Sequence, residues 1–172
     1  MSTFTSPITS RNRIVLGVGA VAAVAALTLS GCSTTTEDPR NAEQSHSEAN
    51  ERLVRELYES NGDPAAFEEL AAPDLVWDIT PGFPFSGVYT GPQGVVEYFG
   101  QLMPAVDEWP TIVEDYFAAG DERVFVTGHY APTNDGETVQ IRFVHEWTVE
   151  DGVLTGMRQA ADSAIARDIV DN

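Results

Sequence analysis

His145 is the residue with the clearest capacity for chemistry. It lies in a run of alternating residues in which Phe143 and Trp147 share its face of an expected strand. An imidazole among apolar side chains has its pKa lowered by desolvation, so it can act as a base or a hydrogen-bond donor near neutral pH. A core histidine that bonds a backbone carbonyl or a tyrosine fits the same position. Both interpretations stay open at the sequence level.

Two more polar candidates lie in the last apolar run, residues 153–163. Gln159 shares a face with Met157, and its amide could hydrogen-bond a ligand. Asp162 could serve as a catalytic base if a bulge turns its carboxylate inward. Capping a turn or pairing with Arg158 is the alternative role for Asp162.

An earlier strand is expected over residues 74–80 (DLVWDIT), with Trp77 and Ile79 on the face that meets the helices and Asp78 on the other. We expect an aromatic pocket there, because large rings bridge the space between helices and a sheet without filling it. The expected ligand-binding residues are Tyr58, Trp77, Ile79, Phe99, Phe143, Trp147 and Gln159.

Composition excludes several kinds of chemistry. The 172 residues include 27 acidic and 9 basic ones, and the formal net charge of −18 argues against nucleic-acid binding. All the basic residues are arginines, so chemistry that needs a lysine amine is excluded. The single cysteine excludes an intrachain disulfide. Pairing His129 with His145 at a metal lacks any motif spacing, and we expect neither a metal nor a cofactor.

The elements that must position these residues begin with helices. Residues 45–48 have the spacing of a capping box, and apolar residues then recur at helical intervals as far as Tyr58. Asp63 and Pro64 open a second, shorter helix, and Pro92 opens a third with Phe99 on its apolar stripe. A short strand is expected at Val88 and Tyr89.

The pattern changes to a period of two after Thr111. Four runs, residues 111–119, 122–131, 137–150 and 153–163, are separated by turn signals such as Asp151-Gly152. The order predicts an α+β fold: a cone-shaped, curved antiparallel sheet with three N-terminal helices packed on its concave face. The orientation of the run that carries His129 and Tyr130 stays open, because both of its faces carry a large apolar residue.

Four segments carry a family resemblance through their order and spacing: residues 62–64 (GDP), 73–77 (PDLVW), 87–91 (GVYTG) and 143–154 (FVHEWTVEDGVL). On these, residues 48–171 resemble the SnoaL-like polyketide cyclases of the cone-shaped superfamily of nuclear transport factor two and ketosteroid isomerase. The resemblance implies a cystatin-like, SnoaL-like fold. The superfamily contains isomerases, cyclases, epoxide hydrolases, dehydratases and pocketed proteins without known chemistry, so the fold leaves the activity open.

The same resemblance bears on the site residues. The position of the proton-shuttling aspartate of ketosteroid isomerases aligns with Ile79, with Asp78 one residue away, so either the register of this strand is shifted or the isomerase base is absent. The position of their neutral carboxylic acid is occupied by His145. The tyrosine donor of those enzymes has Arg55 as its nearest match, with Tyr58 one turn later. Gln159 stands where epoxide hydrolases carry a catalytic aspartate, so that mechanism is not expected. Asp162 is similar to the aspartate that ends this strand in SnoaL-like sequences.

The N-terminal residues predict an export signal. Arg11 and Arg13 precede an apolar run from Ile14 to Leu29, and residues 29–32 (LSGC) resemble a bacterial lipobox, which implies lipidation of Cys32. We expect a signal peptide over residues 1–31, the lipidated cysteine and a polar tether over 32–47, and a SnoaL-like domain over 48–172. The predicted location is the extracytoplasmic side of the cell membrane, with the anchor at Cys32.

Three functional hypotheses follow. The first is a lipid-anchored protein that binds a small hydrophobic or polycyclic ligand without turnover. The second is an isomerase or cyclase that transfers protons with His145 as acid or base, and with Asp162 as a further catalytic residue. The third is a cell-surface assembly module that forms a homodimer through the outer face of the sheet.

Overall fold

The computed structural model describes residues 39–171, and the predicted signal peptide and Cys32 lie outside them. Four α-helices and one 3-10 helix occur in this part of the chain. Their bounds are α1 (Pro39–Glu59), α2 (Pro64–Leu70), α3 (Gly91–Leu102), η1 (Met103–Ala105) and α4 (Ser163–Asp171). Within residues 39–171, no helix combines the length and the apolar character needed to cross a membrane.

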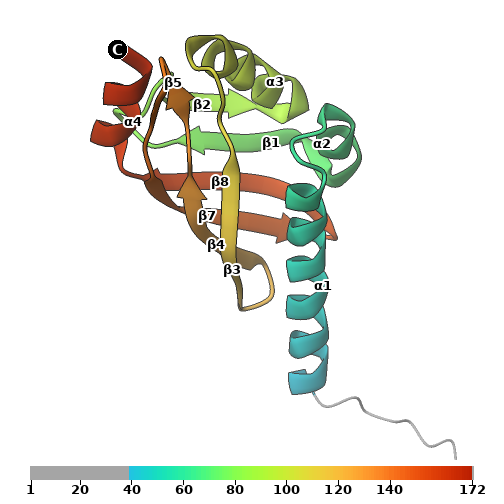
Figure 1. The fold of residues 1–172 in the computed structure, drawn as a ribbon. Coiled ribbons are helices and arrows are strands. Elements are labelled where there is room, and N and C mark those ends of the chain that lie inside the picture. Colours follow the sequence, from blue (N-terminus) through green and yellow to red (C-terminus); the bar gives the residue numbers. More distant parts are fainter. Residues whose placement is uncertain (1–38, 172) are drawn as a thin grey trace, which may run out of the picture. The chain divides into compact units, whose positions relative to one another are not determined.

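The main sheet has six strands in the order β2-β1-β8-β7-β4-β3. The strands are β1 (Ala71–Ile79), β2 (Gly87–Thr90), β3 (Thr111–Ala119), β4 (Arg123–Tyr130), β7 (Ile141–Glu150) and β8 (Val153–Ala161). Neighbouring strands are antiparallel except β1 and β8, which pair in parallel. The sheet is strongly curved, so that β3 runs across the direction of β1 and β8 (Figure 1). The predicted α+β fold with a curved, largely antiparallel sheet is confirmed.

The helices line up with different parts of the sheet. Helix α3 packs against β1 and β2, α2 packs against β1, and α1 packs against β3 and β4 (Figure 1). Asp63 caps α2 as predicted, because its carboxylate accepts a hydrogen bond from the backbone N–H of Ala65 at 2.9 Å. The core lies between these helices and the inward face of the sheet.

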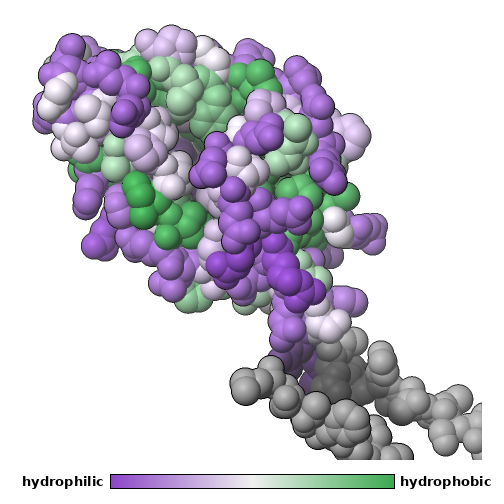
Figure 2. All heavy atoms as spheres, turned by 45° about the vertical axis from the view of Figure 1, so that its right-hand side comes forward, coloured by the Kyte–Doolittle hydropathy of each residue, from purple (hydrophilic) through white to green (hydrophobic). Residues whose placement is uncertain are grey.

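Helix α1 begins earlier than the expected capping box. It starts at Pro39, and Ser45 lies inside the helix. Ser47, within that box, donates its hydroxyl hydrogen to the backbone carbonyl of Gly120 at 2.8 Å, and Asn50 donates to the carbonyl of Asp121 at 2.6 Å. These two bonds fasten α1 to the turn between β3 and β4. The outer surface of α1 is hydrophilic where it faces the viewer in Figure 2.

The β5–β6 hairpin and helix α4 were not predicted. The third expected run is divided, because β6 (Glu137–Thr138) pairs with β5 (Thr133–Asn134) and β7 begins only at Ile141. Helix α4 follows β8 and buries Ala166 and Ile169. Its last buried turn is held to β5 through the side-chain amide of Asn134, which donates to the carbonyl of Ile169 at 3.0 Å.

The predicted inward and outward faces are confirmed on three strands. Trp77 and Ile79 on β1 are buried, whereas Asp78 between them is partly exposed. His145 on β7 and Gln159 on β8 are each 5% exposed and lie opposite one another in the sheet. Alternation along each strand therefore directs these side chains into the space beneath the helices.

Candidate functional site

A cavity of about 780 Å³ lies between the helices and the inward face of the sheet. Helices α1, α2 and α3 contribute Tyr58, Phe67, Tyr98 and Phe99 to its wall, and the sheet contributes Trp77, Tyr130 and Trp147. Among the described residues that line the cavity there is no aspartate, glutamate or arginine. A volume of this size suits a small organic molecule, and the rings offer it apolar contact on several sides.

Most of the residues that the sequence singled out line this cavity. They are Tyr58, Trp77, Ile79, Phe99, His145, Trp147 and Gln159. Phe143 does not line it but lies behind it, stacked on His145 with ring centroids 4.1 Å apart and an interplanar angle of 16°. Phe143 therefore packs against the imidazole that lines the cavity.

Asp162 lies outside the site. Its side chain is exposed, and its carboxylate accepts hydrogen bonds from the backbone N–H groups of Ala164 and Ile165 at 3.1 and 3.3 Å. These bonds cap the N-terminus of α4. The inward bulge that a catalytic Asp162 needs is absent at this position, so the carboxylate does not approach His145 within the cavity.

His145 has a hydrogen-bond partner on each ring nitrogen. The hydroxyl of Tyr58 bonds Nδ1, and the hydroxyl of Tyr130 lies 2.5 Å from Nε2. Each tyrosine is held in turn by a further donor: Trp147 Nε1 donates to the Tyr58 oxygen at 3.0 Å, and Gln159 Nε2 donates to the Tyr130 oxygen at 2.8 Å. These five side chains form one connected polar chain on the cavity wall, which we call the His145 chain.

Burial keeps the His145 chain uncharged. Desolvation lowers the pKa of His145 to about 3, so the imidazole is neutral at pH 7. Desolvation also raises the pKa of Tyr58 and of Tyr130 well above the usual value for a phenol, although the hydrogen bonds from Trp147 and Gln159 act in the opposite direction. The chain can therefore accept and donate hydrogen bonds in the cavity without presenting a charge.

Two buried polar atoms, one of them in the His145 chain, have no hydrogen-bond partner in the described part of the protein. They are the indole Nε1 of Trp77, a donor, and the amide Oε1 of Gln159, an acceptor. The Gln159 main chain is fixed from the other side, because the Thr80 hydroxyl donates to its backbone carbonyl. Buried polar groups without a hydrogen-bond partner carry a cost in stability.

The sequence left Tyr130 unassigned, and the structure makes it a direct partner of His145. One signal was present in Gly128, two residues earlier on the same face. A Cβ at Gly128 would lie 2.1 Å from the carbonyl oxygen of Ile112 and 2.9 Å from Cζ of Phe143. A glycine that must accommodate a large ring indicates the inward face of a strand, and Tyr130 shares that face.

The other titratable candidates lie on the outer face. Asp78 is paired with Arg158 at 3.7 Å, and Nδ1 of His129 lies 2.9 Å from the Glu114 carboxylate. His129 therefore does not join His145. Over residues 39–171, no cluster of three or more histidine, cysteine, aspartate or glutamate side chains has the arrangement of a metal site.

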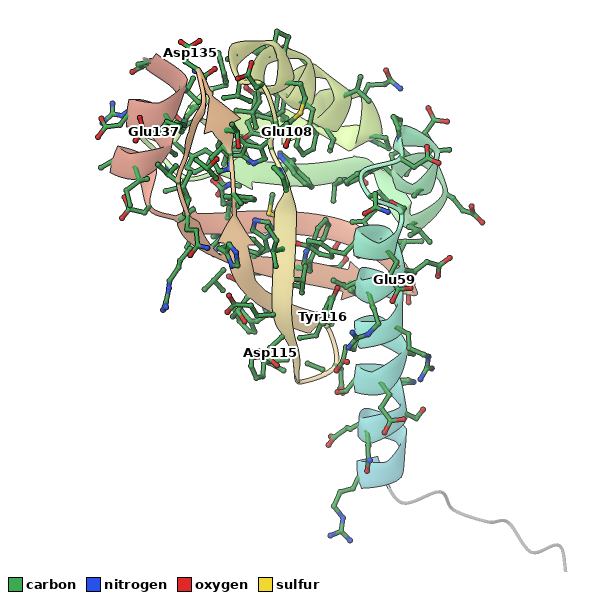
Figure 3. The ribbon with its side chains drawn as sticks, in the orientation of Figure 1. Glu59, Glu108, Asp115, Tyr116, Asp135 and Glu137 are labelled. Carbon is green, nitrogen blue, oxygen red and sulfur yellow. The ribbon has the colours of Figure 1, made fainter. Side chains whose placement is uncertain are left out.

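Tyr116 on β3 extends the aromatic wall toward α1 (Figure 3). Its ring lies edge-on to Tyr58, with centroids 6.0 Å apart, and the Arg55 guanidinium carbon sits 4.0 Å from its centroid. Glu51 pairs with Arg55 at 2.7 Å. Tyr116 thus packs against the ring of Tyr58 from outside the cavity and makes a cation–π contact with Arg55.

Solved structures share this architecture. An NTF2-like protein from Burkholderia thailandensis is 26% identical, with a TM-score of 0.64 over 69% of this chain and 94% of its own. TerC, co-crystallised with polyporic acid, is 22% identical, with a TM-score of 0.66 over 72% and 99% of the two chains. A protein with a cystatin-like fold from Xanthomonas campestris is 23% identical, with a TM-score of 0.59 over 66% and 91%.

A comparison with curated proteins gave no significant match. The sequence model of the SnoaL-like domain, in contrast, matches residues 51–157. That range includes four of the five members of the His145 chain. The fifth, Gln159, follows two residues after its end on β8. The matched range, together with the curved sheet and its covered cavity, assigns the family: this chain belongs to the SnoaL-like domain family.

Proposed function

We propose that this SnoaL-like domain binds a small, uncharged, hydrophobic or polycyclic ligand in its aromatic cavity, without a requirement to convert it. The observation that carries this proposal is the composition of the cavity wall: its described residues combine several aromatic rings with neutral polar groups and include no charged side chain. A ligand with fused rings gains contact with Trp77, Phe99 and Trp147, and polar atoms on it meet the His145 chain.

Intrinsic fluorescence gives a direct test. The protein has three tryptophans, Trp77, Trp109 and Trp147, and all three line the cavity. We expect a neutral two-ring probe such as 1-tetralone to change tryptophan emission with saturation, and the anion 1-naphthoate to bind at least about tenfold more weakly, because the cavity offers its carboxylate no counter-charge. Equal binding of the two probes, or no binding of either, contradicts the proposal.

A matched pair of variants separates cavity binding from surface binding. Phe99 lines the cavity, whereas Phe117 lies on the outer face of β3 and is 52% exposed. Phe99→Leu is expected to weaken 1-tetralone binding severalfold, and Phe117→Leu is expected to leave it unchanged. Native mass spectrometry of the protein purified from its own host would then identify the natural ligand.

The second candidate function is proton transfer of the isomerase or cyclase type. It is favoured by the position of His145, a neutral imidazole held between two tyrosine hydroxyls on the cavity wall. The discriminating observation is turnover: a ligand identified by mass spectrometry and returned unchanged after prolonged incubation supports binding alone. Loss of turnover in His145→Gln would support catalysis.

We also propose that the protein is exported and anchored to the extracytoplasmic side of the cell membrane through lipid on Cys32. The proposal rests on the sequence pattern of residues 11–32. The full chain is expected to partition into detergent and to gain the mass of acyl chains after cleavage before Cys32. Cys32→Ser should move the protein to the aqueous fraction. A wild-type protein that carries no acyl chains and stays in the aqueous fraction would contradict the anchor.

Self-association through the outer face of the sheet is a separate proposal. Val76, Phe117 and Val144 project from this face and are 46%, 52% and 40% exposed. Sedimentation velocity at several protein concentrations tests it. A dimer that Val144→Glu dissociates supports the proposal, and a monomer at all concentrations contradicts it.

A further inference from the structure

The His145 chain has the same construction on both sides of the imidazole. On one side the Trp147 indole, which can only donate, bonds the Tyr58 oxygen, and on the other the Gln159 amide N–H bonds the Tyr130 oxygen. Each phenol oxygen therefore receives one fixed hydrogen bond from outside. Each tyrosine then has one lone pair and its own hydroxyl hydrogen left for its bond with His145.

A count of hydrogens shows that the His145 chain has one hydroxyl hydrogen more than its internal hydrogen bonds use. A neutral imidazole carries one N–H and one acceptor nitrogen, so one tyrosine donates to His145 while the other accepts from it. The accepting tyrosine then receives two hydrogen bonds, and its own hydroxyl hydrogen has no partner within the chain. One phenolic hydrogen is left over in either tautomer of His145.

The tautomer decides which tyrosine holds the spare hydrogen. With the proton on Nε2, Tyr130 accepts from the imidazole and its hydroxyl hydrogen is free. With the proton on Nδ1, the free hydrogen belongs to Tyr58. Both tyrosines line the cavity, so movement of one proton across the imidazole moves the available donor from one point of the wall to another.

We propose that Tyr58, His145 and Tyr130 form a proton relay between two points of a ligand in the cavity; this relay rests on the proposed ligand binding. The tyrosine with the spare hydrogen donates it to a ligand acceptor, such as a carbonyl oxygen, and takes the imidazole N–H proton in exchange. The other imidazole nitrogen takes the hydroxyl hydrogen of the second tyrosine, which removes a proton from the ligand. The ligand gains one proton and loses one, and His145 changes tautomer.

The relay suits an apolar cavity because every group is neutral before and after the transfer. Burial disfavours both the imidazolium and the tyrosinates, so stepwise transfer through charged forms of these groups would be costly. Neither nitrogen of His145 is free to bond the ligand, since both bond tyrosines. The tyrosines are the groups that contact the ligand, and His145 is the positioning residue that couples them.

The relay itself indicates the chemistry of the ligand, because one tyrosine needs a ligand acceptor and the other needs a ligand group that can give up a proton. A ring compound with both a carbonyl and a hydroxyl, or an enolisable position, supplies the two ends of the relay. We therefore assign hydroxy-ketones and related keto–enol pairs as the ligand class.

Imidazole ¹⁵N NMR of the full folded domain tests the relay without a ligand. In the wild type we expect both nitrogens of His145 to show shifts between the protonated and unprotonated limits, with the two tautomers populated within about tenfold of each other. Tyr130→Phe should fix the proton on Nε2 and Tyr58→Phe should fix it on Nδ1, because the remaining tyrosine then donates its only hydrogen to the imidazole. Each variant is expected to shift the tautomer ratio by more than tenfold.

Tyr98→Phe is the matched control, because Tyr98 lines the cavity but does not bond His145. It should keep the wild-type tautomer ratio. A single fixed tautomer in the wild type overturns the relay even if a variant fails to fold, and so does the same tautomer in both tyrosine variants. Binding of 1-tetralone with a fixed tautomer overturns the relay alone, whereas tautomer exchange without binding of any probe counts against the proposed binding function.

Discussion

Trp77 and Trp147 lie edge to face on the inward side of the sheet, with ring centroids 5.8 Å apart and an interplanar angle of 69°, but their indole N–H groups differ. That of Trp147 donates to Tyr58, and that of Trp77 has no partner in the part of the protein that is described. Removing a hydrogen-bonded group leaves its partner unsatisfied, whereas removing an unpaired buried group relieves a cost.

This difference predicts unequal effects of the same substitution. Trp147→Phe should destabilise the protein more than Trp77→Phe by about 2 kcal/mol, since both remove similar ring volume but only the first breaks a hydrogen bond. Urea unfolding with equal m-values measures the difference. An equal loss in the two variants would mean that the Trp77 indole has a partner in solution, such as a bound molecule.

The buried imidazole predicts a pH dependence of stability. The pKa of His145 is about 3 in the folded protein and about 6.5 in an unfolded chain, so below pH 6.5 the unfolded state takes up a proton that the folded state refuses. The stability from His145 is complete above pH 6.5 and is lost as pH falls toward 3. Relative to His145→Gln, the wild type should lose about 1.4 kcal/mol per pH unit between pH 6 and 4.

Thermal or urea unfolding at several pH values measures this slope. A difference between wild type and His145→Gln that stays constant from pH 7 to pH 4 would indicate an imidazole that protonates in the folded state. The relay would then lose the neutral histidine on which its hydrogen count depends.

Gly128 predicts a steric effect at the strand that presents Tyr130. Gly128→Ala should destabilise the protein by about 3 kcal/mol, because the new Cβ would meet the backbone carbonyl of Ile112 and the ring of Phe143. Gly100→Ala is the control: its Cβ meets nothing within 4 Å, and removing a glycine from helix α3 should stabilise by about 0.5 to 1 kcal/mol. Similar stabilities of the two variants would show that β3 moves to admit the methyl group.

Asp162 predicts a structural effect without a functional one. Asp162→Ala should cost about 1 kcal/mol of stability through loss of the α4 cap, and Asp63→Ala should cost a similar amount at α2. Neither should change the affinity for 1-tetralone measured by tryptophan fluorescence. A severalfold loss of affinity in Asp162→Ala alone would place its carboxylate at the cavity after all.

The inward faces of the strands could be predicted because alternation is a local property of the sequence. Trp77, His145 and Gln159 each follow from it. The partners of His145 could not be derived, because which tyrosine reaches an imidazole depends on strand pairing and helix placement. Tyr130 was ambiguous for a physical reason: apolar residues occur on both faces of β4, since Phe125 packs across from Phe117 on the outer face.

The helix ends were harder to predict than the strands. The polar residues 39–47 give no apolar stripe, so only the contacts of Ser47 and Asn50 with the β3–β4 turn show that α1 reaches the sheet there. Helix α4 is short, and its stability comes from burying Ala166 and Ile169 against the rest of the fold. Such tertiary stabilisation leaves little trace in local sequence.

The parallel pairing of β1 with β8 has a consequence for biogenesis. Val76 on β1 pairs with Gly156 on the last strand, and β8 alone joins β1 and β2 to the β7-β4-β3 half of the sheet. While the polypeptide emerges from the ribosome, the two half-sheets can form early, but each keeps an open edge until β8 arrives. A prematurely terminated polypeptide that lacks β8 therefore has no continuous sheet beneath its helices. Its two unpaired strand edges would be exposed to quality-control proteases.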